Sequence, residues 1–296
     1  MAKVVEGYMP FLEYKTYYRI VGERKDNGKA PVIFLHGGPG SSHNYFEVFD
    51  KIADIDDRQL IMYDQIGCGK SFVNNRIDLW VQETWANELI ALIKHLDLDS
   101  FHLLGQSWGG MLAQIYACDY PHEGLKSVIL SSTLPNASLW RDELLRRIKY
   151  LSPAACKAIE TAKENDFYYN KEFLTALDEF MHRYCSYEVT EDSPECLRRE
   201  KKKGGECYFC AWGDNEFTPN GTLKQFDYCE KLKSLDVPAL VMSGAEDICS
   251  PFIAKTIYDL IPDSEWNLFR DARHVCFVED TEEYIRLLLD WLNRRD

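Results

Sequence analysis

Short apolar runs without polar alternation recur along the chain and constrain its fold more than any other feature. They occupy residues 31–35, 60–63, 101–104, 128–130 and 239–242, with a more mixed run at 266–269. A strand of this kind is buried on both faces of a sheet. Between the runs, apolar residues recur at helical spacing in residues 45–55, 79–96, 108–119, 252–261 and 282–292. This alternation predicts an α/β fold with a mostly parallel sheet.

The alternation of strands and helices is absent from two parts of the chain, the N-terminus and a long middle stretch. Two β-rich runs open the sequence, at residues 3–5 and 14–21, and we expect an antiparallel pair joined through Met9-Pro10. Near Pro135 the alternation stops, and it resumes only near Leu235. The stretch between is charged, aromatic and helical in pattern.

We therefore expect a core made of residues 1–133 and 234–296, with residues 134–233 inserted as a helical unit. Within that unit, a run of charges from Arg198 to Lys203 precedes Gly204 and Gly205. This run predicts a solvent-exposed helix end with a glycine stop.

Charge and cysteine content narrow the partners and the compartment. The chain has 34 Lys and Arg against 48 Asp and Glu, a net charge of −14. Such acidity argues against nucleic acid and against an anionic membrane surface, since both need a basic face. The N-terminus lacks the apolar run of a signal peptide, and no stretch approaches the about 20 apolar residues of a bilayer span. Ten cysteines are too few for a disulfide scaffold, which predicts a cytoplasmic protein with reduced thiols.

The pair Cys207 and Cys210 raises the question of a metal. A zinc site needs a second close pair of cysteines or histidines, and the sequence has none. We therefore predict no metal ion. The sequence leaves the oligomeric state open.

The strongest chemical signal is Gly105-Gln106-Ser107-Trp108-Gly109, between an apolar run and a helical pattern. A GxSxG motif in this strand–turn–helix context is typical of a nucleophile elbow. The turn requires small residues two positions before and after the serine, and Gly105 and Gly109 meet that need. It places the Ser107 hydroxyl at the N-terminus of the next helix, whose dipole favours a developing oxyanion.

A serine nucleophile needs a histidine base, which follows it in the chain in this architecture. Three histidines follow Ser107. His122 fits a helix end and His182 falls in the inserted unit. His274 comes just after the last expected strand and before the last helical pattern, so we predict that it is the base.

The remaining parts of a serine hydrolase site can also be assigned. Asp247 follows the apolar run at 239–242 and is the natural acid to orient the histidine, with neighbouring Glu246 as the competitor. Two backbone N–H groups must hold the oxyanion. We expect them from Trp108, directly after the nucleophile, and from Gly38 in the glycine-rich loop after the run at 31–35.

Three segments together resemble the proline iminopeptidase family of α/β-hydrolases. They are His36-Gly37-Gly38-Pro39-Gly40, Asp64-Gln65-Ile66-Gly67-Cys68-Gly69-Lys70-Ser71 and Gly105-Gln106-Ser107-Trp108-Gly109-Gly110. Tricorn-interacting aminopeptidases and L-amino-acid amidases are similar relatives. The resemblance implies an α/β-hydrolase core with a helical cap over the active site. It also implies removal of an N-terminal residue, often proline, from peptides or amino-acid amides without a cofactor.

The resemblance adds candidates for substrate binding. The family's Gly-x-Asn-Glu-Phe motif supplies a carboxylate for the substrate amine, and Glu216 matches it. Asp214 stands at the motif's usual proline. Ile248 stands where the tricorn-interacting relatives carry a second amine-binding acid, and Glu246 is the nearest candidate to replace it.

A group of aromatic residues beside Glu216 has two readings. Tyr208, Phe209 and Trp212 either wall a hydrophobic pocket for the first residue or form the core of the cap. We include Trp212 among the substrate-binding candidates.

Together these features predict a serine hydrolase that releases N-terminal amino acids, proline or other and often hydrophobic. Its substrates would be short peptides or amino-acid amides, cleaved through an acyl-enzyme with no metal or cofactor. The alternative is a carboxylesterase or lactonase that uses the same triad on a neutral substrate. A non-catalytic relative is disfavoured, because Ser107, Asp247 and His274 are all present.

Overall fold

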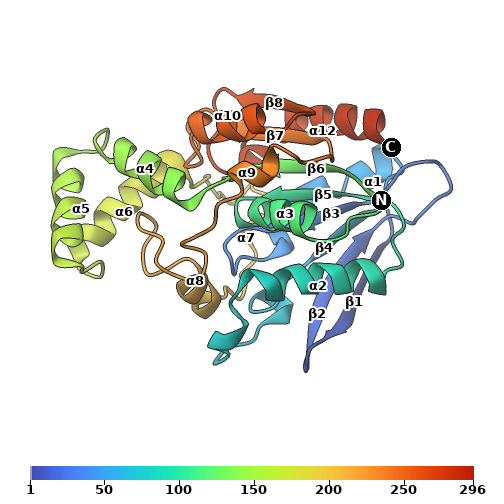
Figure 1. Cartoon of the computed structure of the whole chain (residues 1–296), viewed down its shortest axis with the longest axis horizontal. Coiled ribbons are helices and arrows are strands. Elements are labelled where there is room, and N and C mark those ends of the chain that lie inside the picture. The colour runs from blue at the N-terminus through green and yellow to red at the C-terminus, as the bar shows by residue number, and fades with distance from the viewer. Residues whose placement is uncertain (1) are drawn as a thin grey trace.

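The computed structural model describes residues 2–296, which build an eight-stranded sheet with helices on both faces (Figure 1). The strand order is β1-β2-β4-β3-β5-β6-β7-β8. β2 pairs antiparallel with β1 and with β4, and the other five pairs are parallel. The strands are β1 Val4–Phe11, β2 Tyr14–Val21, β3 Val32–Leu35, β4 Leu60–Tyr63, β5 Phe101–Gln106, β6 Leu125–Ser131, β7 Ala239–Gly244 and β8 Ser264–Phe269.

Alternate residues of the central strands pack into two separate cores, one on each face of the sheet. Ile33 and Leu35 of β3 face α2, α3 and α10, whereas Val32 and Phe34 face η1, α1, α11 and α12. Burial on both faces explains why these strands are apolar throughout. These helices are η1 His43–Phe49, α1 Ile52–Ile55, α2 Gln82–His95, α3 Trp108–Asp119, α10 Pro251–Leu260, α11 Cys276–Glu279 and α12 Thr281–Arg295.

The N-terminal hairpin differs from the expected one in its length. Met9 and Pro10 lie inside β1, opposite Thr16 and Lys15 of β2, and not in a connection between strands. The chain turns instead after Phe11, where Leu12 has a φ of +50°. Because β1 is an edge strand, proline can occupy it without removing a hydrogen bond from the sheet.

Residues 45–55 do not form one helix as expected. The segment is divided into the 3₁₀ helix η1 and the short helix α1, with a turn in which the Asp50 N–H bonds the Glu47 carbonyl at 3.0 Å. Phe46 and Phe49 stack around Phe34 and Phe277. Packing of these rings decides the local backbone over helical propensity.

The unit inserted between β6 and β7 is helical, and its helices α4, α5 and α6 stand away from the sheet (Figure 1). Asn136, Ser152 and Asn170 cap α4, α5 and α6 by accepting a hydrogen bond from the backbone N–H three residues later. Its helices are α4 Ala137–Ile148, α5 Pro153–Asn165, α6 Lys171–Tyr184, α7 Glu195–Arg198, α8 Gly205–Ala211 and α9 Cys229–Leu232. None of the helices in residues 2–296 has both the length and the apolar character that crossing a membrane requires.

The charge run from Arg198 to Lys203 was expected to be a helix end with a glycine stop. The structure shows a different arrangement. α7 ends at Arg198, and residues 199–204 run without helical structure to α8. The Gly204 N–H donates to the Gly40 carbonyl at 2.8 Å, and the Gly69 N–H donates to the Lys202 carbonyl at 2.7 Å. The run therefore packs against the two glycine-rich loops of the core.

Candidate active site

Ser107 occupies the sharp turn between β5 and α3 with a φ of +56° and a ψ of −121°. The flanking glycines are required by sterics. A Cβ atom on Gly105 would lie 2.2 Å from the Gly109 carbonyl oxygen, and one on Gly109 would lie 1.8 Å from the Leu35 carbonyl oxygen. The Ser107 N–H donates to the Ser131 carbonyl at 3.0 Å, and the Thr133 hydroxyl donates to the Ser107 carbonyl at 2.7 Å. The surrounding structure thus holds a backbone conformation that serine rarely adopts.

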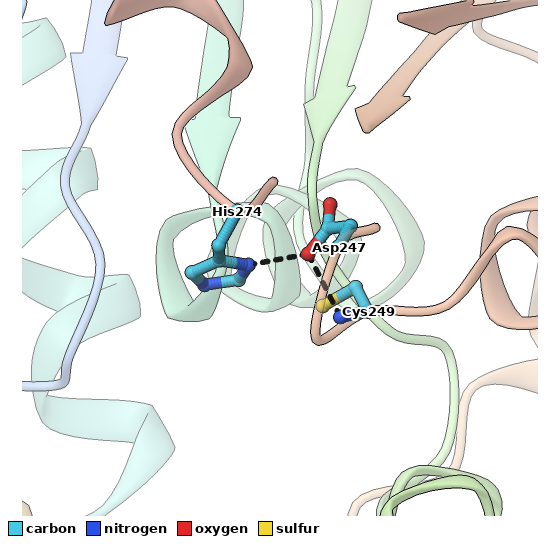
Figure 2. Close-up of side chains that lie close together, drawn as sticks. All are labelled: Asp247, Cys249 and His274. Atoms are coloured by element: carbon cyan, nitrogen blue, oxygen red, sulfur yellow. Dashed lines mark hydrogen bonds and ion pairs between the residues drawn. The ribbon is translucent and has the colours of Figure 1, made fainter. Parts of the chain in front are cut away.

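His274 and Asp247 come from loops that follow β8 and β7, and their side chains meet (Figure 2). The His274 Nδ1 lies 2.8 Å from the Asp247 Oδ1, and the same oxygen accepts the Cys249 N–H at 2.8 Å. Since an ionised carboxylate only accepts hydrogen bonds, Nδ1 carries the proton. Nε2 is then free to act as a base. Asp247 is completely buried, and its hydrogen bond with Nδ1 orients the imidazole.

One cavity of about 260 Å³ contains the nucleophile and the predicted base. Ser107 is half-buried and reaches this cavity together with His274. The other lining residues are Gly37, Gly38, Ser41, Tyr45, Gln106, Trp140, Met181, Cys185, Tyr187, Lys201, Tyr208, Glu216, Ile248 and Val275. Residues before β7 that belong to the unit inserted between β6 and β7, and residues of the sheet-bearing part of the chain, both line this cavity.

The geometry around the predicted oxyanion hole singles out Gly38 in its loop. The neighbouring Gly37 N–H already donates to the Tyr45 hydroxyl at 2.7 Å. Gly38 has a φ of +119°, and a Cβ there would lie 2.5 Å from the Gly40 nitrogen. Trp108 is the first residue of α3, where backbone N–H groups have no partner within the helix. Gly38 lines the cavity with Ser107, and Trp108 directly follows Ser107 in the chain, so their N–H groups stay the candidates for the oxyanion hole.

Glu216 lies in the same cavity as Ser107 and is half-buried. The Tyr208 hydroxyl donates a hydrogen bond to its Oε2. Burial raises the pKa of Glu216 above its usual value, against the opposing effect of the Tyr208 hydrogen bond and of nearby His274. A carboxylate in this position gains most from a cationic partner, because it has lost much of its hydration.

The structure places the other two substrate-binding candidates outside the cavity. The Glu246 side chain is 59% exposed, lies 3.6 Å from Arg147 and lines a separate cavity with Arg146 and Arg183. The backbone turn at Asp247 sends Ile248 into the active-site cavity instead. In this structure Glu246 therefore does not reach the cavity that Ser107 and Glu216 line, and Ile248 occupies that side of Asp247.

Trp212 does not reach the cavity either. It is buried and packs edge-on against Trp140, with ring centroids 5.7 Å apart. Trp140 is the tryptophan that lines the cavity. Of the two readings of the aromatic group, Trp212 fits the cap core. Tyr208 faces the cavity, and Phe209 is exposed.

Sequence reasoning missed two cations that bear on the site. Arg147 of α4 donates to the Asp247 carbonyl oxygen and stacks on the Tyr184 ring at 3.9 Å, so it holds the acid-bearing loop. Lys201 lines the cavity although it belongs to the charge run. No sequence motif marks Arg147 or Lys201 as a site residue, because only the packing of the inserted helices brings each of them to the site.

Asp247, Cys249 and His274 also lie close enough to hold a metal ion, with ligand atoms within 4.8 Å of one another (Figure 2). Their hydrogen bonds argue for a different use. The Cys249 thiol donates to the Ser132 carbonyl at 3.1 Å, and burial raises its pKa well above the usual value. A metal would need the thiolate. The Asp247–His274 hydrogen bond would also have to break.

Comparison with known proteins identifies the family of the chain. Residues 30–166 match the family model described as alpha/beta hydrolase fold. The chain is 57% identical over 294 residues to a proline iminopeptidase of Clostridioides difficile strain 630, covering 99% of this chain and 100% of that protein. It is 58% identical to one of Clostridium botulinum strain Hall, with the same coverage.

Solved structures give the same picture of the fold. The crystal structure of a Mycobacterium smegmatis proline iminopeptidase superposes with a TM-score of 0.87 at 27% identity, covering 98% of both chains. The crystal structure of VinJ superposes with a TM-score of 0.88, also at 27% identity, covering 99% of both chains. With relatives of this identity along its whole length, the chain belongs to the proline iminopeptidase family of α/β-hydrolases.

Proposed function

We propose that this enzyme releases N-terminal proline from short peptides by attack of Ser107 on the first peptide carbonyl. One observation carries the proposal: in the part of the chain that spans residues 2–296, Glu216 is the one carboxylate that lines the cavity with Ser107. A free substrate amine is the natural partner of such a group. Trp140, Met181 and Ile248 supply apolar walls suited to a pyrrolidine ring or a similar hydrophobic side chain.

The mechanism follows from the groups around the serine. His274 Nε2 takes the Ser107 proton as the hydroxyl attacks, and Asp247 stabilises the imidazolium that forms. The N–H groups of Gly38 and Trp108 hold the oxyanion. His274 then protonates the leaving amine, and an acyl-enzyme remains on Ser107. Water, activated by the same histidine, hydrolyses the acyl-enzyme and releases the amino acid.

Glu216 would determine which molecules are cleaved. The substrate ammonium replaces the water that the Glu216 carboxylate has lost on burial. The resulting ion pair stabilises the complex in which the first residue of the substrate lies beside Ser107. A carboxylesterase or lactonase substrate has no such cation. The alternative function is not favoured, because it leaves Glu216 half-buried without a partner for its charge.

We further propose that residues 134–233 act as the cap, with residues 1–133 and 234–296 as the core. Trp140, Met181, Tyr208 and Glu216 belong to this insertion and line the cavity. The steps above need the side chains and backbone of the chain and one water molecule. The cytoplasmic location remains a prediction from the cysteine content.

The direct test is a substrate panel with purified enzyme. Prolyl-naphthylamide should be cleaved, and N-acetylprolyl-naphthylamide and p-nitrophenyl acetate should be far poorer substrates. Ser107→Ala should lose at least about 1,000-fold in kcat, as triad members generally do. Near-normal turnover in this variant, or equal cleavage of the blocked substrate, would refute the proposal.

A further inference from the structure

A second charged group in the active-site cavity has no role in the mechanism above. Lys201 lines the cavity with Ser107. Among residues 2–296 its ammonium forms no ion pair and no hydrogen bond, and its aromatic neighbour is the Tyr45 ring at 5.4 Å. A half-buried ammonium without a carboxylate is unusual, because burying a charge is costly unless it is paired.

The backbone around Lys201 is held in place. Hydrogen bonds from Gly204 to Gly40 and from Gly69 to Lys202 join the segment to the two glycine-rich loops of the core. A Cβ on Gly204 would lie 2.5 Å from the Gly67 carbonyl oxygen, so this close approach depends on glycine. The lysine is therefore presented to the cavity by a fixed segment and not by a free surface loop.

Lys201 and Glu216 both line the cavity, and their side chains have different neighbours. Glu216 is beside Tyr208 of the cap, to which it is hydrogen-bonded. Lys201 is beside Tyr45, whose hydroxyl binds the Gly37 N–H of the oxyanion loop. Burial lowers the pKa of Lys201, Lys203 lowers it further, and Cys196 and Asp64 oppose this shift.

We propose that Lys201 binds the free α-carboxylate of the residue that leaves, so that the enzyme favours dipeptides with a free C-terminus. This inference rests on the proposed function. A dipeptide carries an ammonium and a carboxylate on opposite sides of its one peptide bond, about 7 Å apart when extended. Glu216 and Lys201 match these charges in sign, and Ser107 lies in the same cavity. A cavity of about 260 Å³ suits a substrate of this size.

The test compares prolylglycine with prolylglycinamide, which share the scissile bond and differ in the C-terminal charge. The wild-type kcat/KM should be about tenfold or more higher for the free acid, the usual effect of one charge-assisted contact. Lys201→Gln should bring the ratio of the two substrates near one, and Lys201→Arg should retain most of it. Lys202→Gln is the matched control, because Lys202 is exposed over Phe72, and it should keep the wild-type ratio.

The results separate a failure of the proposed Lys201 contact from a failure of the proposed function. Equal wild-type kcat/KM values for the two peptides would overturn the role of Lys201, and so would a ratio that persists in Lys201→Gln. The wild-type comparison decides even if that variant fails to fold. If wild-type enzyme cleaves neither peptide nor prolyl-naphthylamide, the proposed function itself fails. Cleavage of all three without a preference for the free acid removes only the carboxylate site.

Discussion

At the scale of single residues, the nucleophile elbow depends on space as much as on chemistry. Ser107 has a positive φ, and a side chain on Gly109 would collide with the Leu35 carbonyl of β3. Backbone atoms cannot yield as a flexible side chain can. The GxSxG pattern is therefore a steric requirement of this turn, which is why it could be recognised from sequence.

Gly109→Ala should lower the free energy of unfolding by about 2–4 kcal/mol, because overpacking against backbone forces the strand and helix apart. Gly205→Ala is the control, since a Cβ there meets nothing within 4 Å and its φ is not positive. It should change stability by less than about 1 kcal/mol. Urea denaturation measures both. Equal stabilities for the two variants would contradict the steric account.

The site residues show where sequence reasoning works and where it stops. Ser107, Asp247 and His274 follow strand ends in a fixed chain order, so their positions could be inferred from pattern alone. Glu246 and Ile248 flank Asp247, and only the path of the backbone decides which faces the cavity. Lys201 has no motif, because a connection between α7 and α8 carries it to the site.

At the scale of elements, a buried carboxyl group joins α2 to the sheet and to a core loop. Both carboxyl oxygens of Glu88 accept the Ile66 N–H, at 2.9 and 3.0 Å, and Thr16 of β2 is also hydrogen-bonded to it. Glu88 is completely buried, and its pKa rises to about 8 because burial disfavours the charged form.

This pKa predicts a specific pH dependence of stability. The folded state keeps the proton that the unfolded state loses near pH 4.5, so the contribution is fully present below that pH. It is lost as pH rises through about 8. Glu88→Gln cannot titrate, so its denaturation midpoint should fall less than that of the wild type between pH 5 and pH 8. Glu83→Gln, exposed on the same helix, should follow the wild type. Parallel curves for wild type and Glu88→Gln would contradict the assignment.

Element positions were predicted well where burial fixes them and poorly where tertiary contacts do. The central strands and α3 appear at the expected residues because two-sided burial leaves a continuous apolar run. η1 and the extended β1 differ because aromatic stacking and edge position decide them. The charge run was misread, since its backbone bonds to distant glycine loops cannot be seen locally.

At the scale of the whole molecule, the cap must be held over the core for the cavity to exist. Glu206 of α8 accepts hydrogen bonds from the Trp80 indole at 2.8 Å and from the backbone N–H groups of Asn75 and Arg76 at 2.8 and 3.1 Å. One carboxylate thus joins the cap to a core loop through three donors.

Glu206→Ala should loosen this contact and leave three donors without their acceptor. Hydrogen–deuterium exchange in α8 should become faster, and the KM for prolyl-naphthylamide should rise, while the triad geometry is retained. Glu200→Gln is the control, because Glu200 is exposed in the neighbouring connection. Unchanged exchange in the Glu206 variant would show that this contact does not hold the cap.

The central claim is that Glu216 recognises the free amine of the substrate beside Ser107. The most direct measurement is kcat/KM for prolyl-naphthylamide in Glu216→Gln and in Glu246→Gln, since Glu246 lies outside the cavity. We predict a loss of about 10- to 100-fold for Glu216→Gln, the value of one charge-assisted contact, and no more than about a twofold change for Glu246→Gln. Equal activity in the two variants, or a larger loss in Glu246→Gln, would contradict the account.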